Sequence, residues 1–279
     1  MNIGIVGLGL IGGSIGLKLQ KLNHKVYGCV NNISNEKIAL DRNLADVVSC
    51  DYGILKNCEL IILALPIKDL MNPSIELINS IPSNAVVTDV GSIKKPIVQK
   101  WEKLHTGFIG SHPMAGNENK GAKAGEESLF ENKVWIITPT PKTKKNSIEK
   151  LKKLIFSMNC KIYETFPEEH DKAVSLISHL PIFLSSALIE TANRKDSKSL
   201  LDLSQKISST GFYDTSRVGG GNPDLGVDLA KNNQTNILFA LNIFKEKLNE
   251  LENLIIKKEW NLLKKKLEES RQLRKNFCE

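Results

Sequence analysis

Two segments of the chain hold residue types that suit acid–base chemistry. His112 lies in "GFIGSHPMAG", between a short apolar run and a Gly/Pro-containing turn, and Ser92 lies in "AVVTDVGSIKK", directly after another apolar run. A neutral imidazole can remove an alcohol proton near neutral pH, and a nearby hydroxyl can orient that imidazole or bond the same alcohol. Taken alone, His112 fits an ordinary loop histidine better than a base, and Ser92 fits a cap for the helix beginning "IKKPIVQKW" equally well.

Alternation of short apolar runs with helical patterns indicates how these residues are positioned. The runs are "NIGIVGL", "KVYGCV", "LIILAL", "AVVTDV", "GFIGS" and "VWIITP", and "CKIYET" is a candidate for a closing strand. Strands separated by helices imply crossover connections, so the sequence predicts a Rossmann-type α/β domain with a doubly wound parallel sheet. Ligands of such sheets bind beyond the carboxyl ends of the strands, where Ser92 and His112 both fall.

A glycine motif follows the first predicted strand and opens the first helix. "GLGLIG" matches G-x-G-x-x-G in the context that makes it specific for a dinucleotide. Gly7 permits the tight turn, Gly9 admits a pyrophosphate and Gly12 lets the helix pack on the strand. The N–H groups of Leu10 and Ile11 are then expected to face the phosphates. The alternative is a glycine-rich turn without a ligand.

The end of the second predicted strand bears on the choice of dinucleotide. NAD-specific folds place a ribose-binding acid there, and "YGCVNNIS" supplies none. Its asparagine and serine side chains can donate hydrogen bonds to a 2′-phosphate, although no arginine is present to clamp it. We therefore predict NADP rather than NAD. The residues assigned to this site beyond the glycine motif are Asn31, Asn32, Ser34, Leu65 and Pro66.

The second half of the chain is predicted to be entirely helical. "EHDKAVSLISHLPIFLSSALIETAN", "SLLDLSQKISSTGF" and the segment from Asn236 onward show apolar residues at helical spacing. We expect a dinucleotide-binding domain over residues 1–167 and a helical domain over residues 168–279. The last helix has an apolar stripe that needs burial against its own domain or a second copy of the chain. The stripe consists of Leu241, Phe244, Leu248, Leu251 and Ile255.

Composition and charge argue against several classes of protein. The 279 residues include five dispersed cysteines and no C-x-x-C pair, which argues against disulfides and a zinc site and favours a reducing, cytoplasmic setting. No apolar run reaches the ~20 residues of a membrane span, and no signal-peptide pattern is present. The net charge is +7, and much of it comes from lysines and arginines near the end of the chain that are interspersed with glutamates. Such mixed charge is typical of a solvated helix face, so we expect anionic small molecules as partners rather than nucleic acid.

Taken together, the motifs resemble one enzyme family. "GLGLIG", "VTDVGSIK", "GFIGSHPMAG", "GAKAGEESLF", "ISHLP" and "GFYDTSRVGGGNPDLG" occur in the order found in the prephenate/arogenate dehydrogenases of tyrosine biosynthesis, from residue 3 to about 230. The resemblance implies an oxidative decarboxylation. A ring carbinol gives hydride to the nicotinamide, a base takes the hydroxyl proton, and loss of carbon dioxide restores an aromatic ring. It also implies a homodimer formed through the C-terminal helices.

The resemblance assigns roles to individual side chains. It implies that His112 is the base and Ser92 its partner. Arg217 corresponds to the arginine that binds a substrate carboxylate, and a salt bridge to Asp214 would either orient that arginine or be its whole role. His179 corresponds to a substrate-site histidine, with packing as the alternative.

Three further histidines and one proline complete the expectations. A kink is predicted at Pro181, which lacks an N–H and frees the carbonyl of Ile177. His170 also matches a family position, although an exposed helix histidine is equally expected there. His24 and His105 are predicted to be surface residues.

Two departures from the family pattern bear on the substrate. Ile182 stands where many prephenate-using members have a second histidine, and Gly226 stands where many have a tryptophan. This form resembles the branch that uses arogenate with NADP. We expect oxidation of L-arogenate to L-tyrosine, with prephenate dehydrogenase, a β-hydroxyacid dehydrogenase or imine reductase, or a non-catalytic NADP-binding sensor as alternatives. From the first strand at the start and the last residue at 279, we expect neither a fused chorismate mutase domain nor an amino-acid-sensing domain.

Overall fold

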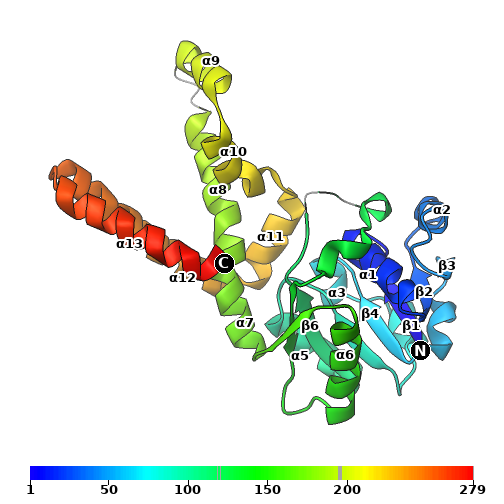
Figure 1. Cartoon of the computed structure of the whole chain (residues 1–279). Helices are drawn as coiled ribbons and strands as arrows, with labels where there is room; N and C mark the ends of the chain where they lie inside the picture. The colour runs from blue at the N-terminus through cyan, green and yellow to red at the C-terminus, as the bar shows by residue number, and fades with distance from the viewer. Residues whose placement is uncertain (118, 120, 194–196, 279) are drawn as a thin grey trace. The chain divides into compact units, whose positions relative to one another are not determined.

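An eight-stranded sheet organises the first part of the chain in the computed structural model, which describes residues 1–117, 119, 121–193 and 197–278 (Figure 1). The strand order is β3-β2-β1-β4-β5-β6-β7-β8. The strands are β1 (Asn2–Val6), β2 (Lys25–Cys29), β3 (Val47–Ser49), β4 (Leu60–Leu63), β5 (Val86–Asp89), β6 (Phe108–Pro113), β7 (Val134–Thr138) and β8 (Lys161–Glu164). The predicted doubly wound sheet is confirmed. The exceptions are β7 and β8, which run parallel to each other and opposite to the other six strands.

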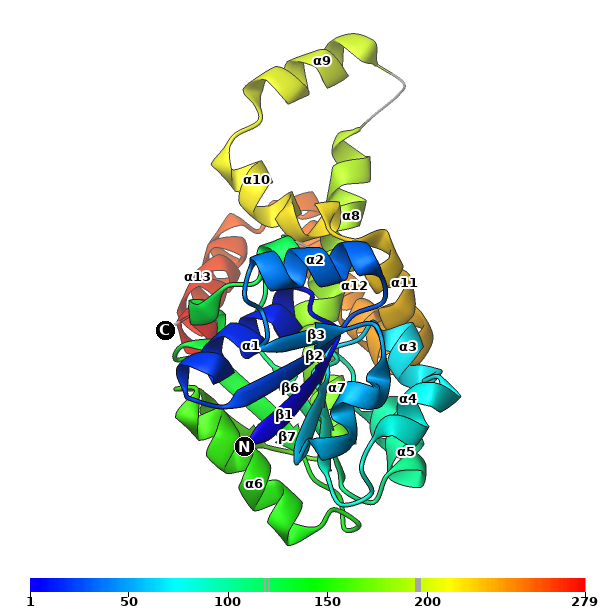
Figure 2. The same ribbon diagram turned by 90° about the vertical axis from the view of Figure 1, so that its right-hand side faces the viewer.

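Helices cover both faces of this sheet (Figure 2). On one face, α1 (Leu10–Lys21) and α6 (Lys145–Ser157) bury Ile15, Leu19 and Leu154 in the main core cluster. The other face carries α3 (Ile67–Met71), α4 (Ile75–Ser80) and α5 (Lys95–Leu104). The remaining elements of this part are α2 (Ile33–Asp41) and the short 3₁₀ helices η1 (Tyr52–Asn57), η2 (Ala122–Ala124) and η3 (Glu127–Phe130).

The helical segments begin directly after β8. They are α7 (Pro167–Val174), the π-turn η4 (Ser175–His179), α8 (Leu180–Ala192), α9 (Lys198–Ile207), α10 (Thr210–Ser216), the 3₁₀ helix η5 (Arg217–Gly220) and α11 (Pro223–Asn232). The irregularity expected at Pro181 takes the form of the π-turn, which ends two residues earlier. Gly219 packs on α8 so closely that a Cβ there would lie 2.6 Å from the main chain of Ser185.

Residues Gln234–Glu279 form a compact unit separate from Met1–Asn233. Within it, α12 (Gln234–Ile256) and α13 (Trp260–Cys278) lie side by side as a hairpin. The continuous helical pattern from Asn236 is therefore interrupted once. Lys258 adopts a left-handed φ of 56°, and the N–H of Glu259 returns to the carbonyl of Leu254 at 2.9 Å. This is the closing bond of a helix C-terminus, formed here without the glycine that usually signals it.

One described helix passes a length-and-hydropathy test for a membrane span. It is the continuous helix Pro167–Ala192, and 22% of its apolar 18-residue window is buried inside the protein. The sequence analysis found no such run because polar residues punctuate it. Core helices of soluble proteins pass the same test. This helix also places the polar side chains of His170, Asp171 and His179 in buried hydrogen bonds.

Candidate active site

A chain of hydrogen bonds links His112 to a buried carboxylate. His112 lies on β6, and its Nδ1 is 2.9 Å from Nε2 of His170 on α7. His170 Nδ1 is in turn 2.8 Å from Oδ1 of Asp171. His170 is 1% exposed and Asp171 is 2% exposed, so the surface position allowed for His170 by the sequence is wrong. The pattern could not reveal this burial because it depends on packing of α7 against the end of β6.

Asp171 also joins the helical segments to the sheet. Its carboxylate accepts the main-chain N–H groups of Lys94 at 2.6 Å and Lys95 at 2.9 Å, at the start of α5. Its carbonyl accepts from the side-chain amide of Asn233 at 2.8 Å, and the same amide lies 3.2 Å from Nδ1 of His179. One residue of α7 therefore holds both the helix that follows the Ser92 loop and the environment of His179.

The hydrogen bonds at the start of α5 show that Ser92 does not cap this helix, which was the alternative role predicted for it. The sequence allowed Ser92 to cap this helix, but α5 begins at Lys95 with no cap from its own segment, and Asp171 takes that part. Ser92 is half-buried in the loop after β5. An interaction with its main chain raises the pKa of the His179 imidazole, against the larger effect of burial. Its side chain is thus not committed to a capping bond.

Burial keeps the site histidines neutral. Desolvation is the largest cause of a His112 pKa well below the ordinary value, and His170, Lys94 and His179 add to that effect. Desolvation also lowers the pKa of His170, against the opposing effect of Asp171. For His179, desolvation lowers the pKa to about 4. The Nε2 atom of His179 is buried and has no hydrogen-bond partner among the residues that the structure describes. A neutral His112 has a lone pair available, as a general base requires.

Fully buried charges lie directly behind His112. Lys94 Nζ forms an ion pair with Asp89 at the end of β5, and both side chains are 0% exposed. Neither residue was assigned a role from the sequence, although both stand in the quoted "VTDVGSIK" motif. A lysine and an aspartate five residues apart beside a strand end were the only signal.

A cleft opens beside the glycine motif. It has a volume of about 350 Å³, and its lining includes Gly7, Gly9, Asn31, Leu65 and Pro66, five of the residues that the sequence analysis assigns to the cofactor. Gly7 has φ +95°, and a Cβ at Gly12 would lie 1.9 Å from the carbonyl oxygen of Gly7. Nothing lies within 4 Å of a Cβ placed at Gly9, which leaves the space that a pyrophosphate needs. These residues fit a nicotinamide dinucleotide.

The other residues predicted for the cofactor are not among those that line this cleft. Leu10 and Ile11 begin α1, whose first turn has no side-chain cap and no acidic residue, so its N–H groups suit an anion. Asn32 caps α2, accepting the N–H of Asn35 at 2.8 Å, and Ser34 lies in the first turn of α2. Several lining residues were not assigned from the sequence, among them Asn35, Tyr52, Asp69, Gly121 and Ala122.

The predicted substrate residues of the helical part are held by fewer contacts than the histidines described above. Asp214 in α10 and Arg217 in η5 are both exposed, and among the described residues no ion pair joins them. The guanidinium is therefore available to a carboxylate. His105 is half-buried rather than on the surface, with Nε2 3.0 Å from the carbonyl of Pro82, and His24 is also half-buried.

Comparison with known proteins identifies the family. The model of the nucleotide-binding domain of prephenate dehydrogenase matches residues 15–164, and that of the prephenate dehydrogenase dimerization domain matches residues 166–269. The chain belongs to the prephenate dehydrogenase family. The prephenate dehydrogenase of Bacillus subtilis is 34% identical over 84% of this chain, and the match spans 64% of that relative's length.

Two solved structures show the same fold over almost the whole chain. The arogenate dehydrogenase of Synechocystis is 37% identical with a TM-score of 0.86, and each chain is covered completely. The prephenate dehydrogenase of A. aeolicus, solved with hydroxyphenyl propionate and NAD+, is 28% identical with a TM-score of 0.92, covering 99% of this chain and 98% of that one. The relatives of this chain therefore include enzymes named for prephenate and an enzyme named for arogenate.

The two departures from the prephenate dehydrogenase pattern are neighbours in space. A Cβ placed at Gly226 in α11 would lie 4.0 Å from Cγ2 of Ile182 in α8, although the two positions are 44 residues apart. Ile182 follows His179 by three residues, at the start of the same helix. An apolar residue and a glycine thus form one small wall where many prephenate-using members place a histidine and a tryptophan.

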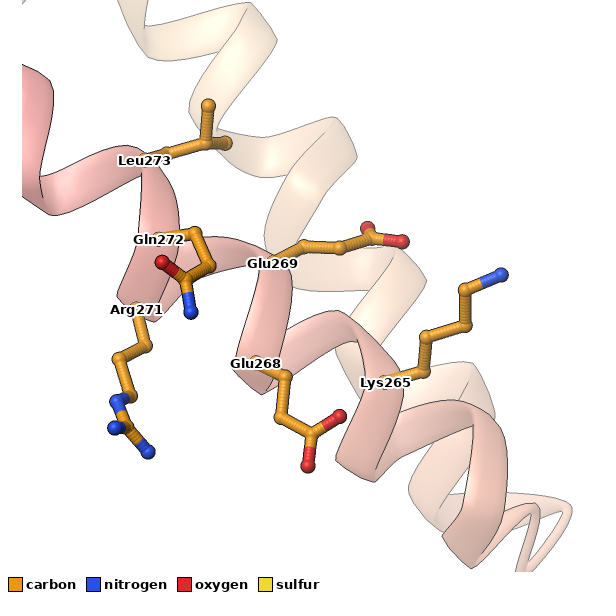
Figure 3. Close-up of a pocket in the computed structure, with 6 residues that line it drawn as sticks. All are labelled: Lys265, Glu268, Glu269, Arg271, Gln272 and Leu273. Atoms are coloured by element: carbon orange, nitrogen blue, oxygen red, sulfur yellow. The ribbon is translucent and has the colours of Figure 1, made fainter.

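A larger hollow lies on α13. It measures about 710 Å³, and Figure 3 shows that its lining side chains come from α13 alone. They are mostly charged and point away from the helix, and they are Lys265, Glu268, Glu269, Arg271, Gln272 and Leu273. Such an open, charged groove lacks the enclosed apolar wall that a small-molecule site needs.

Proposed function

We propose that this protein is an NADP-dependent dehydrogenase that converts L-arogenate to L-tyrosine by oxidative decarboxylation. The observation that carries the proposal is the neutral His112, held by the His170–Asp171 pair at the carboxyl end of β6, in the same sheet whose strands β1 and β2 contribute to the dinucleotide cleft. Membership of the prephenate dehydrogenase family supports the reaction class. Prephenate is the alternative substrate, because relatives named for each are similar to this chain.

The tautomers of the two histidines follow from the fixed acceptor at the end of the chain. Asp171 is an acceptor, so the proton of His170 lies on Nδ1 and its Nε2 is free to accept. Nδ1 of His112 therefore carries a proton and donates it to His170. The remaining nitrogen, Nε2 of His112, has the lone pair. This is the arrangement of a general base oriented by a buried carboxylate through a second ring.

In the proposed reaction, His112 Nε2 takes the proton of the ring hydroxyl. The electrons of that O–H bond form a C=O bond as the carbinol C–H bond breaks, and NADP supplies the acceptor for the departing hydride. Breakage of the bond to the ring carboxylate then releases carbon dioxide, and its electron pair restores the aromatic ring. Ser92 bonds the same hydroxyl, and Arg217 holds a carboxylate through its planar guanidinium fork. Alignment is the main task of the protein, because aromatisation favours the decarboxylation.

The wall formed by Ile182 and Gly226 supports arogenate. The side chain of prephenate ends in a keto acid, whose oxygen a histidine can bond, and this chain lacks such a donor at residue 182. The similarity to the arogenate dehydrogenase of Synechocystis, at 37% identity, points the same way.

The preference for NADP rests on the end of β2. Asn31 Oδ1 accepts hydrogen bonds from the amides of Asn32 at 3.0 Å and Asn35 at 2.7 Å. Its own amide is thereby left as a donor, and none of the three residues directly after β2 is an acid that would repel a 2′-phosphate. Asn32 serves α2 as a cap, so we assign the contact to Asn31.

A homodimer in the cytoplasm completes the proposal. The family model that matches residues 166–269 describes a dimerization domain, which supports pairing through the helical half. The apolar face of α8 and the stripes of α12 and α13 are the proposed contact, rather than a membrane. We do not assign a nucleic-acid partner.

Initial rates decide the substrate and the cofactor together. Purified protein is assayed with arogenate and prephenate, each with NADP and NAD, by the absorbance of the reduced nicotinamide. We expect turnover only with the combination of arogenate and NADP. Faster turnover of prephenate would refute the argument from Ile182 and Gly226. Turnover with no pair, together with measurable NADP binding, would favour a non-catalytic sensor.

A further inference from the structure

The buried ion pair behind His112 has no part in the chemistry above. Burying two charges costs several kcal/mol unless good geometry and further hydrogen bonds compensate. Here each charge has such partners. The Asp89 carboxylate accepts the N–H of Gly91 at 2.9 Å and that of Ser111 at 3.2 Å, and Lys94 Nζ donates to the Ser111 carbonyl at 2.6 Å. The pair is therefore built into the strand ends rather than trapped there.

The ion pair stands where two strands separate. The ladder between β5 and β6 has its last pair at Thr88 and Ile109. Beyond it, both main-chain groups of Ser111 are bonded to side chains, the N–H to Asp89 and the carbonyl to Lys94. These side chains continue the connection after the ladder ends. That is the level at which ligands bind to an open α/β sheet.

The same pair connects the two segments that carry the proposed base and its partner. Asp89 and Lys94 are the ends of the loop that contains Ser92, and their contact closes it. Ser111, which both of them hold, directly precedes His112 on β6. A shift of either charged side chain would therefore move Ser92 and His112 relative to each other.

The ion pair is also part of the electrostatic surroundings of His112. Lys94 acts on the imidazole together with His170 from α7 and His179 from η4, and all three favour its neutral form. The carboxylates act on this cluster with the opposite sign, as their effects on His170 indicate. They are Asp89, on the far side of Lys94, and Asp171.

We propose that Lys94 and Asp89 are positioning residues, which fix Ser92 and His112 relative to each other and hold the Lys94 ammonium against the Ser111 carbonyl, next to His112. The inference rests on the proposed role of His112 as the base. It adds two residues to the site and assigns their charges a purpose beyond stability.

The test is the double variant Lys94→Met/Asp89→Asn, which removes both charges at nearly constant volume and leaves no unpaired buried charge. NMR titration of the imidazoles in protein without ligand is expected to show a higher His112 midpoint than in the parent protein, because the Lys94 cation, which favours the neutral imidazole, is gone. We also expect kcat to fall about tenfold or more, with KM for NADP unchanged, because the cleft lining is untouched. The matched control is Lys150→Met/Glu59→Gln, a partly exposed pair at 3.3 Å, which should change none of these.

An unchanged His112 midpoint or an unchanged kcat in a folded double variant would overturn the proposal. If the parent protein turns over no substrate, the proposed function fails, but the titration of His112 can still be read.

Discussion

Replacing Asp171 by asparagine isolates the charge at the end of the histidine chain. The asparagine oxygen is expected to remain at the Oδ1 position, where it accepts both Lys94 N–H and His170 Nδ1–H. The new amide then faces Lys95 N–H, whose residue is exposed and can turn to water. The tautomers of the two histidines are therefore preserved, and the negative charge is lost.

The size of the effect follows from the geometry. Hydrogen bonds of 2.8 and 2.9 Å on either side of the His170 ring separate the carboxylate from the His112 ring. Unit charges about 7 Å apart interact by about 2 kcal/mol at an effective dielectric constant of about 20. The positive charge that forms on His112 loses this stabilisation, which corresponds to a fall in kcat of about thirtyfold. The free His112 pKa should also fall, so the acid limb of kcat/KM should move to lower pH.

The assay is kcat and its pH dependence with arogenate and NADP. Loss of the bond to Lys95 should cost about 1 kcal/mol of unfolding free energy, so a control of equal stability cost is needed. Ser74→Ala provides one, because Ser74 Oγ caps α4 by accepting Leu77 N–H at 3.2 Å, and loss of such a cap also costs about 1 kcal/mol. The control should retain parental kcat. An Asp171→Asn protein that is folded, with kcat within about threefold of the parent and an unmoved acid limb, would refute the role of the chain.

Three further results are expected. The folded pKa of His179 is lowered from 6.5 to about 4, so the unfolded chain binds the extra proton first, and the free energy of unfolding should fall by about 3 kcal/mol as pH drops from 6.5 to 4, measured by urea denaturation. Gly12→Ala should destabilise the fold by about 2 kcal/mol, because its Cβ would lie 1.9 Å from the Gly7 carbonyl oxygen, whereas Gly9→Ala should fold normally and lose only dinucleotide affinity in calorimetry; equal stability of the two variants would contradict this. Asn31→Asp should raise KM for NADP about tenfold or more and leave KM for NAD similar, and a parallel change in both would count against a 2′-phosphate contact.

The sheet could be predicted because most of its strands are long, apolar and well separated. β3 and α2 were missed, since Val47–Ser49 is only three residues long and the asparagines around α2 suggested a ligand. In the structure Asn32 caps α2, and Asn43 ends it with a left-handed φ of 52°. The local signal was present, but an asparagine that caps a helix and one that faces a phosphate look alike in the sequence.

The candidate site could be predicted only where a motif is contiguous. His112 and the glycine turn are embedded in such motifs. The cap supplied by Asp171 to Lys94 joins residues 77 positions apart, and the contact between His112 and His170 joins residues 58 apart. Nothing local distinguishes a histidine in the first turns of an exposed helix from one pressed against a strand end, so His170 could not be assigned.

The cap on α5 also determines when the site can be assembled during synthesis. Residues 1–164 leave the ribosome first and contain every strand, the glycine turn and both His112 and Ser92. Yet the amides that open α5 stay unbonded until Asp171 arrives, and the surroundings of His179 wait for Asn233. A nascent chain can thus form the sheet and the glycine turn before the proposed base is oriented, and the hydrogen-bond chain from His112 to Asp171 is completed only when the helical segments have emerged and docked.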